Sequence, residues 1–234
     1  MQKVLIVIFI SLIAWNSNAQ KFGKNIPSFQ YRNWHFGTML GTNTTSYNVQ
    51  FKDNPFQYDS VSNINIESRP GMAIHIPLVS YNAHETFHFR FLSSISFHET
   101  NFNYAYYEEG RLKRKQYRTE PVYLNFPLFV KVNTKRINNF SAYALGGAGY
   151  SLDLASQKDV EQSVQSPILK LKQHDWQYHV GGGFDFYLPY FKLGLEIKTT
   201  RGITNIMIQD NTFFSSPIES LKSRMWWFSI TFEG

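Results

Sequence analysis

An alternation of apolar and polar residues with a period of two constrains the fold most strongly. Near the C-terminus, Trp226, Phe228, Ile230 and Phe232 alternate with a second set that is mostly small and polar. Successive side chains of a β-strand point to opposite faces of a sheet, so this pattern predicts strands with one apolar face. The same alternation recurs clearly in 87–98, 122–132, 176–188 and 191–198, and more weakly in 34–49, 69–79 and 140–154. The sequence therefore predicts an all-β fold of about eight strands.

The composition combines many aromatic residues with few charges. Each class makes up 17% of the 234 residues, and the mean hydropathy is −0.32. A soluble globule seldom needs so many rings with so few charges, whereas a protein of membrane-spanning helices would be more hydrophobic. The absence of cysteine excludes disulfides, cysteine nucleophiles and thiolate metal sites. The formal charge of +6 is mild and spread along the chain, so we expect no nucleic-acid partner.

The N-terminal segment has the layout of a secretory signal peptide. Lys3 precedes an apolar run from Val4 to Trp15, and the small residues Ser17 and Ala19 stand three and one positions before Gln20. This pattern predicts a signal peptide that is cleaved between Ala19 and Gln20. A buried N-terminal helix or a membrane anchor is the alternative, but the run is too short to span a bilayer comfortably. After residue 20 no apolar run reaches the roughly 18 residues of a transmembrane helix.

The connections between the expected strands alternate in length. Short ones fall near 81–85, 134–139 and 188–191, and long polar ones near 50–67, 107–120, 155–172 and 208–222. Outer-membrane barrels have this asymmetry, with short periplasmic turns and long extracellular loops. Rings near the expected strand ends fit the interfacial girdles of such barrels: Trp34, Tyr178, Trp226 and Phe232. A β-sandwich or a lipocalin-like barrel with an apolar interior would also alternate.

These features together predict an eight-stranded antiparallel transmembrane β-barrel with short periplasmic turns and long extracellular loops, located in the outer membrane. Outer-membrane lipid and lipopolysaccharide would then surround it. The expected divisions of the chain are a signal peptide over 1–19, a short periplasmic lead over 20–33 and the barrel over 34–234.

Charged residues fall on the face that would line the lumen of this barrel. Eight strands enclose only enough space for side chains, which argues against an open porin. A symmetric turn at Pro189 would pair Gly183 with Glu196, and would place Asp185 diagonally to Lys192. Because isolated buried charges are costly, we expect these groups to neutralise one another as an interior plug, or alternatively to form a functional site. The expected lumen network is Arg90, Lys131, Asp185, Lys192, Glu196 and Lys198, with His179 among the interior residues.

The histidines do not form a metal-binding pattern. His84 and His88 are four residues apart, which on a turn and strand separates them by roughly 13 Å. His88 and His98 would lie on one face of a strand but about 30 Å apart. We therefore expect no metal and no cofactor.

Catalytic motifs are also missing from the chain. No nucleophile-elbow, zinc-protease or phosphate-loop motif occurs. A serine hydrolase acting on lipid A would need Ser151 or Ser163 beside His174 at the outer rim, with a carboxylate behind the histidine. Residues of these types occur in the loops of any barrel. We expect a protein that is not an enzyme and has no small-molecule substrate.

A basic stretch lies in the long connection over 107–120. It could bind the phosphates of lipopolysaccharide or an acidic partner, or simply be a solvated loop beside anionic lipid. Its cations are Arg111, Lys113, Arg114, Lys115 and Arg118.

Several segments resemble the PorT family of outer-membrane barrels from Bacteroidota. The most specific is GGGFDFYLPYFK at 181–192 followed by EIK at 196–198, and the resemblance covers nearly the whole mature chain. Further matching positions are LKLK at 169–172, Gly202, Asn205, LKSRM at 221–225, FPL at 126–128 and the stretch 143–150.

The resemblance implies a role and partners. PorT-like proteins belong to the type IX secretion system, which exports folded cargo with C-terminal signals across the outer membrane and supports gliding motility in some species. It implies a non-enzymatic component with other secretion proteins as partners, and it transfers no catalytic residue. The alternative is a stand-alone small barrel that acts as a lipid A-modifying enzyme or as an adhesion or stress protein.

Overall fold

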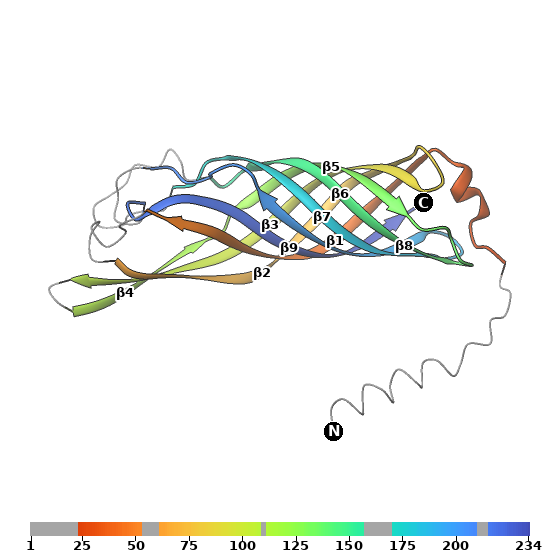
Figure 1. Ribbon diagram of the computed structural model, residues 1–234. Helices are drawn as coiled ribbons and strands as arrows, with labels where there is room; N and C mark the ends of the chain where they lie inside the picture. Colours follow the sequence, from red (N-terminus) through yellow and green to blue (C-terminus); the bar gives the residue numbers. More distant parts are fainter. Residues whose placement is uncertain (1–22, 53–60, 109–110, 157–169, 210–214) are drawn as a thin grey trace, which may run out of the picture.

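Eight antiparallel strands close into a barrel in the computed structural model of the chain (Figure 1). The structure describes residues 23–52, 61–108, 111–156, 170–209 and 215–234. The ring runs β2-β1-β9-β8-β7-β6-β5-β3, and pairing between β2 and β3 closes it. The elements are η1 (Pro27–Tyr31), β1 (Trp34–Phe51), β2 (Val61–Asn82), β3 (Phe87–Glu108), β4 (Arg111–Thr119), β5 (Val122–Asn133), β6 (Phe140–Asp153), β7 (His174–Tyr187), β8 (Lys192–Gly202) and β9 (Ile218–Glu233). The predicted fold class is confirmed.

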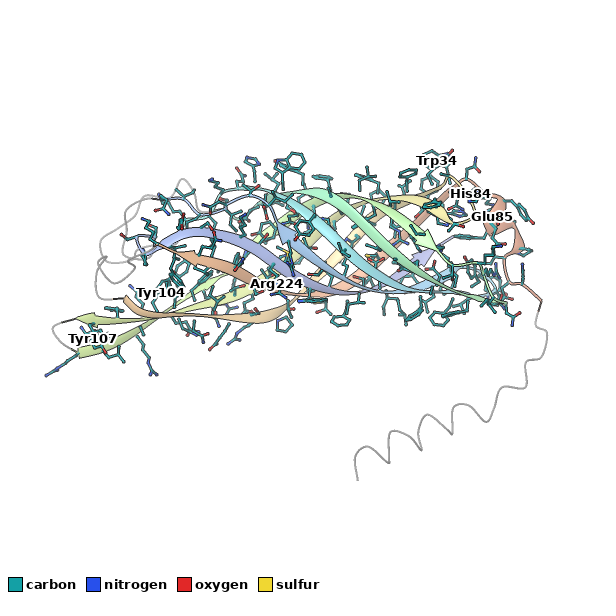
Figure 2. All side chains as sticks on the ribbon, in the orientation of Figure 1. Trp34, His84, Glu85, Tyr104, Tyr107 and Arg224 are labelled. Carbon is teal, nitrogen blue, oxygen red and sulfur yellow. The ribbon has the colours of Figure 1, made fainter. Side chains whose placement is uncertain are left out.

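The apolar face of each barrel strand points outward. On β3, Phe89 and Phe91 are 46% and 39% exposed, whereas Arg90 between them is 1% exposed. A soluble sandwich or lipocalin would bury the phenylalanines and expose the arginine. Trp34, exposed on the outside where β1 begins, lies near the end of the barrel as the aromatic girdle predicts (Figure 2). Apolar side chains on the outside and a charged side chain on the inside identify a barrel whose outer surface faces lipid.

The two ends of the barrel differ. Three short turns and both described chain ends lie at one end, where Figure 2 labels Trp34, His84 and Glu85. Tyr104 lies near the other end of the barrel, and Tyr107 lies farther out (Figure 2). In outer-membrane barrels the short turns face the periplasm, so the end with Tyr107 is extracellular.

Two of the expected long loops contain strand. β1 continues to Phe51 and β2 begins at Val61, so half of the expected connection 50–67 extends the barrel outward. The expected loop 107–120 is wrong in a similar way, because β4 pairs with β3 from Thr100↔Thr119 to Glu108↔Arg111. β4 is a ninth strand outside the ring, and it lacks an apolar alternation because seven of its nine residues are exposed: all but Tyr117 and Thr119.

An apolar cluster holds this extracellular extension, which comprises the outer parts of β2 and β3 together with β4. Phe102 and Tyr104 of β3 are almost fully buried, and Tyr117 of β4 packs against the same cluster. The residues covering them are Tyr47, Leu171, Ile206, Met207, Ile218 and Leu221. The extension is thus a folded part of the protein with a core of its own, which explains why strand pairing continues beyond the membrane.

The described part of the lead packs on the periplasmic mouth of the barrel. Phe29 of η1 stacks on His35 with ring centroids 3.7 Å apart, and the Lys192 ammonium lies 4.6 Å from the Phe29 ring centre. Asn25 donates a hydrogen bond to the carbonyl oxygen of Tyr187. The expected signal peptide, with its cleavage between Ala19 and Gln20, lies outside the described residues. Within the described ranges, no helix has the length and apolar character needed to cross a membrane.

Candidate functional site

Arg90 of β3 is the centre of a charged network inside the barrel. Its side chain is 1% exposed, and its guanidinium donates to Glu196 Oε2 at 2.8 Å and to Glu233 Oε1 at 2.7 Å. These three groups come from β3, β8 and β9, on opposite sides of the ring. The pairing satisfies the charges that burial would otherwise make costly.

Two lysines extend the network towards the periplasmic mouth. Lys131 Nζ lies 2.7 Å from Asp185 Oδ2, and Lys192 Nζ lies 2.7 Å from Glu233 Oε2 and 3.7 Å from Asp185 Oδ2. All of these side chains are buried. Since Lys192 also contacts Phe29, the network links the lumen to the lead segment.

Lys198 and Tyr143 complete the network on its other side. Lys198 Nζ lies 3.4 Å from Glu196 Oε1, and the Tyr143 hydroxyl donates to Glu196 Oε2 at 3.0 Å. The Lys131 ammonium lies 3.6 Å from the centre of the Tyr143 ring, a cation–π contact. The network therefore holds four cations and three carboxylates. Tyr143 connects Lys131, which lies over its ring, with Glu196, which accepts from its hydroxyl.

The structure thus brings together all six charged residues that the sequence analysis assigned to the lumen. It also pairs Gly183 with Glu196 and Gly181 with Lys198, the register expected from the turn at Pro189. A Cβ at Gly183 would lie 2.6 Å from the Tyr143 hydroxyl oxygen. Glycine at that position is what allows Tyr143 to approach Glu196.

Sequence reasoning missed Glu233 and Tyr143. Glu233 follows Ser229 and Thr231 on the lumen face of β9, so the alternation itself placed its carboxylate inside. Tyr143 carried no comparable signal, because the alternation of β6 is blurred by small residues on both faces. Its role depends on the glycine opposite, which only the register identifies.

Two histidines of the lumen, His98 and His179, make hydrogen bonds to hydroxyl groups. His98 contacts Ser96 Oγ at 2.7 Å through Nε2 and Thr45 through Nδ1, and His179 Nδ1 contacts Thr200 Oγ1 at 2.7 Å. Among the described residues, no three His, Asp or Glu side chains are grouped as metal ligands. These histidines act as polar filling of the lumen.

Ser151 and His174, which a serine hydrolase would need side by side, are not in contact. Ser151 is buried in the lumen, where its hydroxyl donates to Asn125 Oδ1 at 2.6 Å. His174 is exposed on the outside of the barrel and contacts the Tyr150 hydroxyl. The two side chains lie on opposite faces of the wall, and Ser163 lies outside the described residues.

The basic stretch lies on β4, at the free edge of the extension. Arg118 contacts Glu120, and its Nη2 lies 3.3 Å from Glu99 Oε2, while Arg69 Nε lies 3.3 Å from Glu99 Oε1. Burial raises the pKa of Tyr117 on the inner side of β4. The remaining candidate cations Arg111, Lys113, Arg114 and Lys115 are exposed nearer the tip.

Side chains fill the lumen at the level of the network. Arg90, Lys131, Met39 and Phe129 are each at most 2% exposed. The interior of the barrel is therefore closed at this level. Among the described residues, accessible charged groups lie on the outer wall, on the extension and on the periplasmic turns, where Glu85 and Lys135 are exposed.

Comparison with known proteins agrees with this class. The outer membrane protein beta-barrel domain family matches residues 18–207, and the chain belongs to this family. The chain therefore is an outer-membrane protein. No curated protein matches it in sequence.

The solved structures that match this chain include two outer-membrane proteins. The attachment invasion locus protein Ail of Yersinia pestis, in complex with the heparin analogue sucrose octasulfate, is 14% identical with a TM-score of 0.38. That match covers 87% of this chain and 100% of Ail. The outer membrane protease OmpT of Escherichia coli is 11% identical with a TM-score of 0.34, and the match covers 86% of this chain and 95% of OmpT.

Proposed function

We propose that the protein is a non-enzymatic component of the type IX secretion system, needed for export of cargo proteins and, in species that glide, for gliding motility. The observation that carries this proposal is the place of the PorT-like residues in the barrel. The stretch 181–192 and the following 196–198 supply Asp185, Lys192, Glu196 and Lys198 to the lumen network. The residues that resemble the family thus have an architectural role, as expected for a family without a catalytic centre.

Because the lumen is closed, a role in secretion would depend on the outer surfaces of the protein. Cargo cannot pass through a barrel whose interior is filled by Arg90 and Lys131, so a part in secretion requires contacts with other proteins. The extracellular extension offers one such surface, because its folded core presents the basic strand β4 with one edge unpaired among the described residues. The lead at the periplasmic mouth offers a second.

The proposal includes the expected processing of the chain. A signal peptide over 1–19 would direct export and be removed between Ala19 and Gln20, leaving 20–33 as the periplasmic lead. Peptide mapping of the N-terminus of the protein isolated from outer membranes tests this step. A mature chain that retains Lys3 would contradict it.

Gene deletion in the native host tests the secretion role. We expect cargo with type IX C-terminal signals to accumulate inside the deleted cells, as measured by mass spectrometry of culture medium and cell fractions. Complementation with the parent chain should restore secretion. A second complementing chain tests whether β4 is a required contact, and in it five residues are changed to Ser: Arg111, Lys113, Arg114, Lys115 and Arg118. Normal secretion after deletion would overturn the proposal.

The same strains distinguish the alternative functions. A lipid A-modifying enzyme would change the mass spectrum of lipid A between parent and deleted cells, whereas a secretion component leaves it unchanged. An adhesion protein would change attachment to surfaces without retaining cargo. These measurements separate the secretion component from a stand-alone barrel.

A further inference from the structure

Two arginines face each other on the outside of the barrel. Arg201 of β8 and Arg224 of β9 are direct cross-strand partners, and both side chains are exposed. In the described part of the chain, neither guanidinium has a carboxylate within salt-bridge distance. Like charges directly opposite on a sheet destabilise it, so the pair favours a bound anion between its members.

The surroundings of the pair are suited to an anion. Tyr178 pairs with Arg201 on one side, and Ser46 pairs with Arg224 on the other. Lys222 lies two residues before Arg224 on the same face of β9. A surface hollow of about 430 Å³ lies among these residues, and its lining contains three cations and no carboxylate. The Tyr178 hydroxyl adds a neutral donor at its edge, whereas the Ser46 hydroxyl donates to the carbonyl oxygen of Arg224.

The position of the hollow relative to the membrane selects the ligand. From Arg224 towards the periplasm, the outward side chains of β9 are Trp226, Phe228, Ile230 and Phe232. The eight residue steps from Arg224 to Phe232 span about 27 Å along the strand, or roughly 20 Å across the membrane at the usual tilt. Figure 2 shows Arg224 between Trp34 at the periplasmic end and Tyr104 in the extension. The arginines therefore lie at the outer edge of the lipid-facing band, at the level of lipid headgroups.

We propose that Arg201, Arg224 and Lys222 bind a phosphate group of lipid A in the outer leaflet. Two guanidinium groups offer planar forks of N–H donors, the geometry that recognises phosphate oxygens, and the ammonium of Lys222 adds a point charge. The acyl chains of the same lipid would lie along the apolar face below the hollow, beside Trp226 and Phe228. The site is independent of the proposed role in secretion.

The cations of β4 do not suit this ligand. Phe97 is the last aromatic residue of the outward apolar band on β3, and Arg114 pairs with Ala105, eight positions further along. That separation is about 27 Å along the strand, beyond the headgroup level. Arg118 is nearer the membrane, but Glu99 and Glu120 already neutralise it. The basic stretch and the arginine pair are therefore separate surfaces.

Binding of purified lipid A to the detergent-folded full chain tests the site. Bisphosphorylated lipid A should raise the unfolding temperature of the parent chain, and Arg201→Gln/Arg224→Gln should weaken the apparent affinity about tenfold or more. The matched control Arg111→Gln/Arg114→Gln removes the same two charges from β4 and should bind as the parent does. Dephosphorylated lipid A should bind the parent at least about tenfold more weakly, and millimolar inorganic phosphate should not displace lipid A.

Several outcomes would overturn the site. Equal binding by the parent and the Arg201→Gln/Arg224→Gln chain would do so, as would a loss confined to the β4 control. Displacement by inorganic phosphate would assign the hollow to free phosphate and overturn the lipid proposal. Heat-modified mobility on gels verifies that each variant is folded. Lys222→Gln alone removes one of the three cations and should weaken binding less than loss of both arginines. Without lipid A, removing the arginine pair should leave the unfolding temperature unchanged or raise it, because repulsion is relieved; a lower value would indicate a purely structural role.

Discussion

Glu233, the residue before the C-terminal glycine, accepts a hydrogen bond of 2.7 Å from Arg90, which is 143 positions away in the sequence. Arg90 lies on β3 and Glu233 on the last strand, so the contact crosses the lumen. Glu233 also pairs with Lys192. The end of the chain is thereby joined to the interior by two buried ion pairs.

Replacing Glu233 by Gln should destabilise the barrel strongly. The change removes the carboxylate that compensates Arg90 and Lys192, and loss of one partner of a buried pair costs about 3–5 kcal/mol. Thermal unfolding of the detergent-folded chain, followed by circular dichroism, measures the effect. Glu219→Gln is the control, since this exposed residue lies on the same strand. An unfolding temperature equal to that of the parent would show that the ion pairs contribute nothing.

Glu196→Leu should lower the unfolding temperature as well. The substitution leaves Arg90, Lys198 and the Tyr143 hydroxyl without their shared acceptor. We expect a loss of about 3 kcal/mol or more, because a buried charge is left uncompensated. Urea titration of the protein in lipid vesicles provides the measurement. Unchanged stability would remove the case for a network.

Lys131 and Asp185 should show strong coupling in a double-mutant cycle. Their charged atoms are 2.7 Å apart and both side chains are buried. The double change Lys131→Met/Asp185→Asn should cost less than the sum of the single changes by about 0.5–3 kcal/mol. Additive single effects would mean that the two groups act independently.

Two glycines should differ in their response to replacement by alanine. A Cβ at Gly183 would lie 2.2 Å from the Leu195 carbonyl oxygen, whereas at Gly146 only the His179 carbonyl oxygen comes within 4 Å, at 3.9 Å. Gly183→Ala should therefore destabilise by about 1–3 kcal/mol through overpacking, and Gly146→Ala should be nearly neutral. Comparison of the two unfolding temperatures tests this. Equal effects would contradict the described packing around Tyr143.

The barrel should not conduct ions. Side chains of the network and of Met39 and Phe129 fill the lumen of the ring. We expect no steady single-channel conductance from the parent chain in planar bilayers, with a known porin as the positive control for insertion. A steady open level would show that the lumen is not closed.

Much of the fold was predictable because a barrel wall is a local pattern. Period-two alternation and the turn at Pro189 were enough to place Gly183 opposite Glu196 and Asp185 diagonal to Lys192. The sequence did not predict strand β4, because most of its side chains face solvent and it has no apolar periodicity. Its strand state depends on pairing with an edge of β3 that continues beyond the membrane.

The sequence by itself determined which face of each strand is apolar, and which charged residues share the opposite face. Both properties repeat over two residues and need no knowledge of distant neighbours. Only the tertiary structure decided that Arg90 reaches both Glu196 and Glu233, and that Arg201 and Arg224 form a pair outside the wall. These contacts depend on ring closure and strand stagger, because closure brings together strands that are far apart in sequence.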